Sequence, residues 1–333
     1  MPDSLAALRM RLTRVVDLNN ASAILAWDQE TYMPPGGAYH RADQLSTLRG
    51  LAHELFVDEE IGAVLEDLSN EMQRGADYDS DDASFVRFHW REYQKAVRIP
   101  TDLVVEIART SALALEAWRT ARETNNFKHF EPLMEKTLEL QVRRAEALGN
   151  PSGNLYDALL NDYDPGMTYE AINTVFSGLK PNLIELVKGI SAHQDAVDDS
   201  IIAGDYPIEQ QMVFSRQVSE ALGYDYARGR IDISTHPFTI DFGRDDVRIT
   251  TRFMPDNIQS SLMGTIHETG HALYEQNTST TLDRTGLDTG SGMSVHESQS
   301  RFYENVMGRS RAFWRYWYPR LQQSFPGPLS RVS

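Results

Sequence analysis

Residues 267–271 read HETGH, and this short stretch constrains how the surrounding chain must fold. On an α-helix, positions i and i+4 lie one turn apart on the same face, so His267 and His271 would direct two imidazoles at one place. Paired imidazoles suit a zinc ion, and Glu268 beside them is placed to take a proton from water that the metal activates. The alternative is that both histidines are ordinary polar residues of a helix, so the surrounding sequence must be weighed as well.

The sequence on either side of this motif predicts a helix. Four apolar residues recur at helical spacing and form one stripe: Ile258, Leu262, Ile266 and Leu273. Asp256 is the predicted N-cap, with Gln259 three residues later completing a capping-box-like pair. The helix is expected to end near Asn277. The two histidines then fall on a different face from the apolar stripe, which leaves them free to bind a metal.

A catalytic zinc needs a third protein ligand, and Glu297 is the preferred candidate. It follows His271 by 26 residues, which leaves room for a glycine-rich loop and the start of a second helix. His296 is a rival ligand. In addition, Ser294-x-x-Glu297 matches a capping box, in which Glu297 would only satisfy the first turn of its helix. Glu297 is preferred because a His2Glu set suits a hydrolytic zinc and a helix start holds the carboxylate rigidly.

Composition excludes several classes of function. The 333 residues carry a net charge of −16, which argues against nucleic acid or anionic membranes as partners. The chain has no cysteine, so a disulfide-stapled fold is excluded and any metal must be held by histidine and carboxylate. Neither a signal peptide nor an apolar run of about 18 residues is visible. A cytoplasmic protein is expected.

Most of the chain has the pattern of helices. The predicted ranges are 4–26, 38–57, 59–74, 82–97, 101–124, 129–148, 168–189 and 208–222. Thr101 is a predicted N-cap, and residues 150–154 predict a loop. A mainly α fold follows, expected as one domain over 1–333. Within it, 1–205 would form a helical N-terminal region and 206–333 the metal-binding catalytic region.

One segment departs from the helical pattern. Residues 238–242 and 247–253 alternate at period two and are joined by 243–245, which predicts a small antiparallel hairpin before the metal helix. One side of the second strand carries Asp246, Arg248 and Thr250. That polar side faces either solvent or a cleft. A strand edge beside a zinc helix can hold an extended peptide by main-chain hydrogen bonds, so peptide is the more natural substrate than a sugar or a nucleotide.

Six longer strings lie in one order along nearly the whole chain. They are WDQETYMPPGG at 27–37, YDPGMT at 163–168, HPF at 236–238, DVRIT at 246–250, HETGH at 267–271 and HESQSR at 296–301. In this combination the chain resembles the carboxypeptidase Taq family of zinc-dependent metallocarboxypeptidases. The resemblance implies a mainly α, multi-helix, cleft-containing fold of the gluzincin kind. It also implies removal of single residues from peptide C-termini with broad side-chain tolerance.

The resemblance further implies which residues act. The family's metal ligands match His267, His271 and Glu297, and its general base matches Glu268. His236 and Arg248 match motifs that line the family's substrate cleft. One Zn2+ per chain is expected, with Co2+ as a substitute, and family members are commonly homodimers when full length.

The chain departs from the family pattern at its end. Two further family strings, Ile-Arg-x-x-Ala-Asp and Gly-x-x-Gln-Asp-x-His-Trp, belong beyond Ser333 and are not present. A C-terminally truncated chain is therefore expected, without the family's arginine for the substrate carboxylate. Arg248 is a candidate for that cation within the chain, whereas Arg301 is favoured as an i,i+4 partner of Glu297.

Two alternatives to the carboxypeptidase prediction stay open at this point. One is an inactive or weakly active truncated fragment that binds metal without turnover. The other is an endopeptidase or a dipeptidyl peptidase with the same metal layout, because such specificity depends on cleft walls that a zinc motif does not describe.

Overall fold

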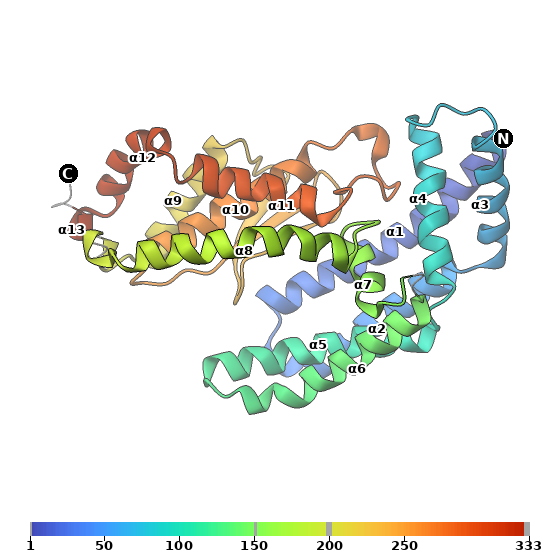
Figure 1. Cartoon of the computed structure of the whole chain (residues 1–333), viewed down its shortest axis with the longest axis horizontal. Helices are drawn as coiled ribbons and strands as arrows, with labels where there is room; N and C mark the ends of the chain where they lie inside the picture. The colour runs from blue at the N-terminus through green and yellow to red at the C-terminus, as the bar shows by residue number, and fades with distance from the viewer. Residues whose placement is uncertain (1, 150–151, 198–201, 330–333) are drawn as a thin grey trace. The chain divides into compact units, whose positions relative to one another are not determined.

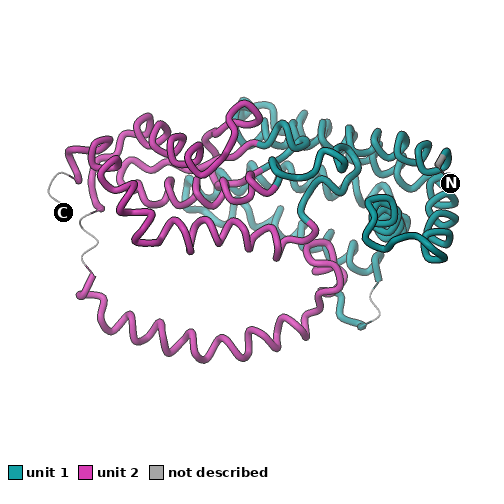
Figure 2. The backbone as a smooth tube through the Cα atoms, turned by 90° about the horizontal axis from the view of Figure 1, so that it is seen from above, with its two compact units in different colours: residues 1–155, 240–247, 275–290 teal, residues 156–239, 248–274, 291–333 magenta. Residues whose placement is uncertain are grey.

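The structure is a computed structural model that describes residues 2–149, 152–197 and 202–329. Its contacts divide the chain into two compact units that interleave in sequence (Figure 2). Unit 1 comprises 1–155, 240–247 and 275–290, and unit 2 comprises 156–239, 248–274 and 291–333. Helices dominate both units (Figure 1), which confirms the mainly α fold class. The single domain expected over 1–333 stays a prediction.

Unit 1 is built from the first helices of the chain. They are α1 (Pro2–Thr31), α2 (Ala38–Phe56), α3 (Glu59–Met72), α4 (Asp81–Ala96), α5 (Thr101–Glu123) and α6 (Glu131–Leu148), with 3-10 turns η1 (Pro35–Gly37), η2 (Phe127–His129) and η5 (Thr280–Leu282). Leu8 of α1, Leu65 of α3 and Phe85 of α4 pack in one buried cluster. The N-cap predicted at Thr101 is wrong: the extended Pro100 precedes the first turn and Thr101 already lies inside the helix. In the predicted 150–154 loop, Asn150 and Pro151 lie outside the described residues.

The other elements lie mainly in unit 2. They are α7 (Leu155–Tyr163), α8 (Tyr169–Ser191), the turn η3 (Gln194–Ala196), α9 (Ile208–Ala221), β1 (Gly229–Ile233), β2 (Thr239–Asp241), β3 (Val247–Thr251), α10 (Ile258–Gln276), α11 (Met293–Arg301), the π-helical η6 (Phe302–Met307), α12 (Arg311–Ser324) and α13 (Pro326–Leu329). No helix among the described residues combines the length and the apolarity that crossing a bilayer requires.

The apolar stripe of α10 is buried, as its spacing predicts. Leu262 and Ile266 pack against Phe214 of α9 and against Trp317 and Leu321 of α12. Burial of each such side chain stabilises the fold by about 1.5–3 kcal/mol. This core therefore determines how α10 is rotated and turns its histidines to another face. The N-cap predicted at Asp256 is wrong. Helix α10 begins at Ile258, and the side chain of Asn257 caps it by accepting a hydrogen bond from the Ser260 amide at 3.0 Å.

The predicted hairpin is present, with one strand more than expected. Phe242 donates to the carbonyl of Asp246 at 3.0 Å, and Thr250 donates to that of Phe238 at 2.8 Å, which defines an antiparallel β2–β3 pair. The sheet order is β1-β3-β2, so β3 is central and β2 is an edge strand. Strand β1 (Gly229–Ile233) was not predicted, although it is as long as β3 and also alternates polar with apolar residues.

At Thr250, the polar side of β3 faces neither solvent nor a cleft, the two alternatives that the sequence leaves open. Thr250 is fully buried. Its hydroxyl oxygen accepts a hydrogen bond from the Phe238 amide at 3.0 Å and lies 2.6 Å from the Ser234 hydroxyl. This buried hydroxyl therefore joins β3 to the segment before β2 instead of facing solvent or a cleft.

Helices α10 and α11 touch through their backbones. A Cβ atom placed on Gly270 would lie 2.7 Å from the Cα of Ser300 and 3.1 Å from the carbonyl oxygen of Gln299. The amide of the Gln299 side chain donates to the carbonyl of Gly270 at 3.0 Å. Only glycine permits this approach, which brings the Glu297 helix against the histidine helix.

We expect Gly270→Ala to destabilise the protein by about 1–3 kcal/mol, because the methyl group would meet backbone that cannot move aside. Urea unfolding followed by circular dichroism measures this change. Gly178→Ala on α8 is the matched control, since nothing lies within 4 Å of its Cβ position and alanine favours a helix. Equal stability of Gly270→Ala and the wild type would contradict the backbone contact.

Candidate metal centre

The structure brings His267, His271 and Glu297 together in unit 2. One donor atom from each lies within 4.8 Å of the other two. Glu297 Oε2 is 3.5 Å from the Nε2 atom of His267 and 3.1 Å from that of His271. Donor atoms around a tetrahedral zinc, with bonds of about 2.0–2.1 Å, are about 3.3 Å apart. The donor set and its spacing therefore fit a zinc ion, although the assignment as ligands stays a proposal.

The two imidazoles lie one turn apart on α10, with ring centroids separated by 5.0 Å. Burial and, after it, the neighbouring His296 and His267 rings lower the pKa of His271 to about 4, although Glu297 acts in the opposite direction. Neutral imidazole offers the lone pair that a cation requires, so His271 is ready to bind metal at neutral pH. The Glu297 side chain is more exposed to solvent than that of His271, with exposed fractions of 35% and 12%.

His296, the rival ligand, lies on the other edge of the His271 ring. It contacts Nδ1 of His271, whereas Nε2 of His271 faces Glu297. The His271 and His296 rings stack at 4.7 Å between centroids, and Tyr274 packs on His296 at 4.8 Å. This geometry favours Glu297 over His296 as the third ligand.

The capping box that competed for Glu297 does not form. The amide and the hydroxyl of Ser294 both donate to Oδ1 of Asp164, at 3.1 and 2.5 Å. The Glu297 carboxylate instead accepts hydrogen bonds from the Ser300 hydroxyl at 2.9 Å and from Nε of Arg301 at 2.8 Å. Arg301 is thus the i,i+4 partner of Glu297, as the sequence favours.

Hydrogen bonding keeps Glu297 ionised. Partial burial acts to raise its pKa, but the bonds from Ser300 and Arg301, together with the two histidines, hold the pKa below its ordinary value. An ionised carboxylate carries the negative charge that stabilises a bound cation.

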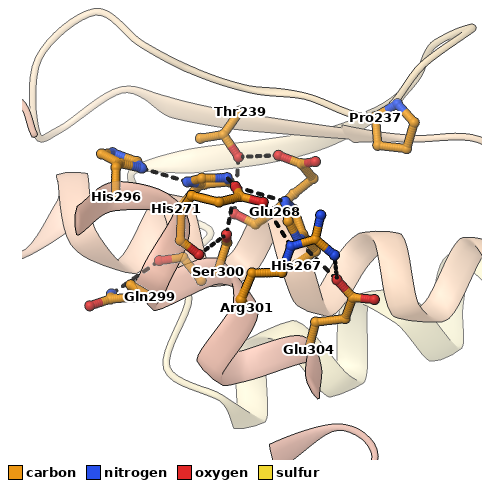
Figure 3. A network of polar contacts seen from close by, with 12 residues as sticks. Pro237, Thr239, His267, Glu268, His271, His296, Gln299, Ser300, Arg301 and Glu304 are labelled. Carbon is orange, nitrogen blue, oxygen red and sulfur yellow. Dashed lines mark hydrogen bonds and ion pairs between the residues drawn. The ribbon is translucent and has the colours of Figure 1, made fainter. Parts of the chain in front are cut away.

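Glu268 lies beside the three donors and is 95% buried, with a relative exposure of 5%. Its Oε2 accepts a hydrogen bond from the hydroxyl of Thr239 on β2 at 2.8 Å (Figure 3). The pKa of Glu268 is raised to about 7, chiefly by burial; the hydrogen bond from Thr239 acts to lower this pKa, and the charges of Glu297 and Glu304 act to raise it. A carboxyl group with such a pKa can both accept and return a proton near neutral pH. Sequence reasoning missed Thr239, because only the fold brings β2 to α10.

Glu304 is a second residue that sequence reasoning missed. Its Oε2 is 3.0 Å from Nδ1 of His267, and its Oε1 accepts a hydrogen bond from Arg309 at 2.9 Å. It lies on the π-helical turn η6, where Gly308 donates to the carbonyl of Tyr303. A carboxylate on the far nitrogen fixes the orientation of a metal-binding imidazole. Glu304 follows Glu297 by seven residues, and this spacing could have indicated that both lie on one face of a helix. The π-helical turn that brings Glu304 to His267 is not predictable from that spacing.

The two expected substrate residues, His236 and Arg248, both belong to unit 2. His236 is exposed, with Nδ1 at 2.6 Å from the carbonyl oxygen of Pro237. Pro237 packs 3.5 Å from the Cβ position of Gly264, so this segment runs along α10 before the histidines. Arg248 is half-buried on β3. Their roles toward substrate stay proposals.

We expect Glu304→Gln to weaken zinc binding about 10–100-fold, because the amide no longer provides the charge that orients His267. Competition with a chromophoric chelator measures the dissociation constant. Glu220→Gln, an exposed carboxylate on α9, is the control and should bind zinc like the wild type. An unchanged constant for Glu304→Gln would exclude a positioning role for this residue.

The raised pKa of Glu268 predicts how the metal-free protein responds to pH. The folded pKa is about 7, above the unfolded value of 4.5, so the unfolded state releases this proton first as pH rises. Stability should fall by on the order of 3 kcal/mol between pH 4.5 and 7 through this group. Relative to the wild type, Glu268→Gln should then gain stability between pH 5 and 8 in the presence of chelator. A constant difference across this range would show that Glu268 is not perturbed.

Comparison with known proteins places the chain in one peptidase family. The family model for carboxypeptidase Taq (M32) metallopeptidase matches residues 7–333. Thermostable carboxypeptidase 1 of Thermus thermophilus is 39% identical over 319 residues, covering 92% of this chain and 62% of the relative. Carboxypeptidase 1 of Bacillus subtilis is 33% identical over 322 residues, covering 97% of this chain and 64% of the relative.

A solved structure agrees with these sequences. The BsuCP crystal structure superposes with a TM-score of 0.95 at 32% identity, over 99% of this chain and 66% of that one. The chain thus spans less than two thirds of the length of the curated relatives that it matches. A match of the family model from residue 7 to residue 333 shows that this chain belongs to the carboxypeptidase Taq (M32) family of metallopeptidases.

Proposed function

We propose that this chain carries the hydrolytic centre of a metal-dependent carboxypeptidase, which removes single residues from peptide C-termini with broad specificity. The observation that carries the proposal is a buried carboxyl group, Glu268, with its pKa raised to about 7 beside a His2Glu donor set. Such a group beside such a donor set is the arrangement of zinc peptidases. The names of the relatives, which are carboxypeptidases, support the choice of reaction.

Zinc is the proposed metal, one per chain, with cobalt as a substitute. His267, His271 and Glu297 would hold it, because two imidazoles and one carboxylate suit zinc. A bound divalent cation supplies positive charge that activates water and polarises the scissile carbonyl. Glu268 accepts the proton of the attacking water and returns it to the leaving amine, and the Thr239 hydroxyl holds the Glu268 carboxyl group in place.

The proposed substrate is an extended peptide. Strand β2 is an edge of the sheet, and its Thr239 contacts Glu268, so a peptide that added to this edge would pass the proposed base. His236 and Arg248 are the proposed substrate residues. Arg248 is the candidate within this chain for pairing with the substrate carboxylate, since a guanidinium can bind a carboxylate through two hydrogen bonds.

Three further features belong to the same proposal. The protein acts in the cytoplasm, which fits a chain without cysteine. The full-length protein is a homodimer, and light scattering of the purified protein tests this. The region 206–333 is the catalytic part, since it contains every proposed ligand and the proposed base.

The decisive variant is Glu268→Gln, which keeps the size of the side chain but removes the base. We expect it to bind one zinc per chain and to lower peptide hydrolysis about 10²–10⁴-fold, because proton transfer is lost while the donor set is intact. Metal analysis and release of amino acids from an N-blocked peptide measure the two properties. Glu220→Gln is the control.

Each result with the N-blocked peptide decides between the candidate activities. Release of single C-terminal residues by the wild type supports the carboxypeptidase. Internal cuts would indicate an endopeptidase, and release of dipeptides a dipeptidyl peptidase. Bound zinc without any turnover would indicate a metal-binding chain that needs further residues for activity. Full activity of Glu268→Gln would remove Glu268 as the base.

A further inference from the structure

Helix α8 exposes an apolar face along its whole length. Its 23 residues include none that is buried. Six apolar side chains recur at alternating spacings of four and three: Ile172, Phe176, Leu179, Leu183, Leu186 and Ile190. The last five are 48–61% exposed. We call these six residues the α8 seam. A regular four-three repeat is the pattern by which one helix packs lengthwise against another.

The opposite face of α8 is polar. It carries Glu170, Thr174, Ser177, Glu185 and Lys188. Charges of both signs occur there, and the chain is strongly acidic overall, with a net charge of −16. A helix that lies on an anionic membrane instead has a basic polar face. The charges of α8 therefore disfavour a lipid surface as the occupant of the seam.

The bend of α8 indicates on which side the occupant lies. Pro181 stands inside the helix on the polar face, opposite the seam. A proline bends a helix away from its own side, because its ring meets the preceding turn and one hydrogen bond is lost. The seam is therefore on the concave side. Figure 2 shows α8 as the long magenta helix that bows away from the other helices of unit 2, so its concave side faces its own unit.

The same unit exposes a second apolar stripe next to the metal centre. Val295, Phe302 and Val306 follow one face of α11 and η6 and are 51%, 49% and 60% exposed. This is the segment that carries Glu297. Unit 2 thus presents two stripes of exposed apolar side chains, and contiguous exposed apolar surface often marks an interaction site.

We propose that the α8 seam is the docking surface for an amphipathic helix from the third of the family fold that lies outside these 333 residues. The relatives match this chain over 62–64% of their own length, so about a third of the family fold is available as occupant. From Ile172 to Ile190 the α8 seam is about 27 Å long, which calls for a partner helix of about five turns. A concave seam that faces its own unit suits a segment of the same fold better than a second copy approaching from outside.

The test uses the intact 333-residue chain, co-expressed with the part of the Bacillus subtilis relative that lies outside the match. We expect this part to co-purify with the tagged chain and to slow hydrogen exchange over residues 169–191 about tenfold or more. Leu179→Glu/Leu183→Glu should abolish both effects, because two carboxylates would be buried in the seam. Thr174→Glu/Ser177→Glu places the same charges on the polar face and should keep both.

Three results would overturn the proposal. In the first, the segment co-purifies equally with Leu179→Glu/Leu183→Glu. In the second, protection of 169–191 rises with concentration in the chain alone, which would make a second copy the occupant. The third uses a fusion of the segment to the end of this chain, which removes any failure of two separate chains to meet. Exchange over 169–191 as fast in this fusion as in the chain alone would show that the segment does not cover the seam.

Discussion

The metal centre depends on the backbone contact between α10 and α11. Oε2 of Glu297 on α11 lies 3.5 Å from Nε2 of His267 and 3.1 Å from Nε2 of His271 on α10, a spacing that side-chain flexibility alone would not maintain. The absence of a Cβ atom at Gly270 lets Ser300 approach α10 closely. Because metal ligands must be held within a fraction of an ångström, the fold has to determine this approach before any ion binds. Gly270 inside the HETGH motif is therefore as necessary for this geometry as the two histidines.

Around the donors, a second layer of charged and polar groups determines their protonation. Ser300 and Arg301 keep Glu297 ionised, whereas Thr239 only partly offsets the burial that raises the pKa of Glu268. The pKa values of these two neighbouring carboxyl groups are thus shifted in opposite directions, down for Glu297 and up for Glu268. The half-buried Glu297 is suited to hold a cation, and the buried Glu268 is suited to exchange a proton. This separation of roles arises from burial and hydrogen bonding and not from the residue type.

Unit 2 exposes apolar side chains on α8 and along α11 and η6. This chain matches 62% of the Thermus thermophilus relative, and the described residues bury no side chain of α8. Asp164, which lies just before α8, accepts hydrogen bonds from the Ser294 amide and hydroxyl at the start of α11. The segment leading into α8 is therefore directly bonded to the helix that carries Glu297. An occupant of α8 would act on the same local framework as the metal.

The sequence by itself predicted most of the helices, the α10 stripe, the β2–β3 hairpin and the grouping of His267, His271 and Glu297, because local spacing and turn residues carry that information. It did not determine the third strand, the cap of α10 or the partners Thr239 and Glu304. Thr239 reaches Glu268 only because β2 is an edge strand, and Glu304 reaches His267 only through a π turn. Contacts between residues distant in sequence depend on packing, so the tertiary structure alone decided which carboxyl group is buried, which is ionised and which merely orients a histidine.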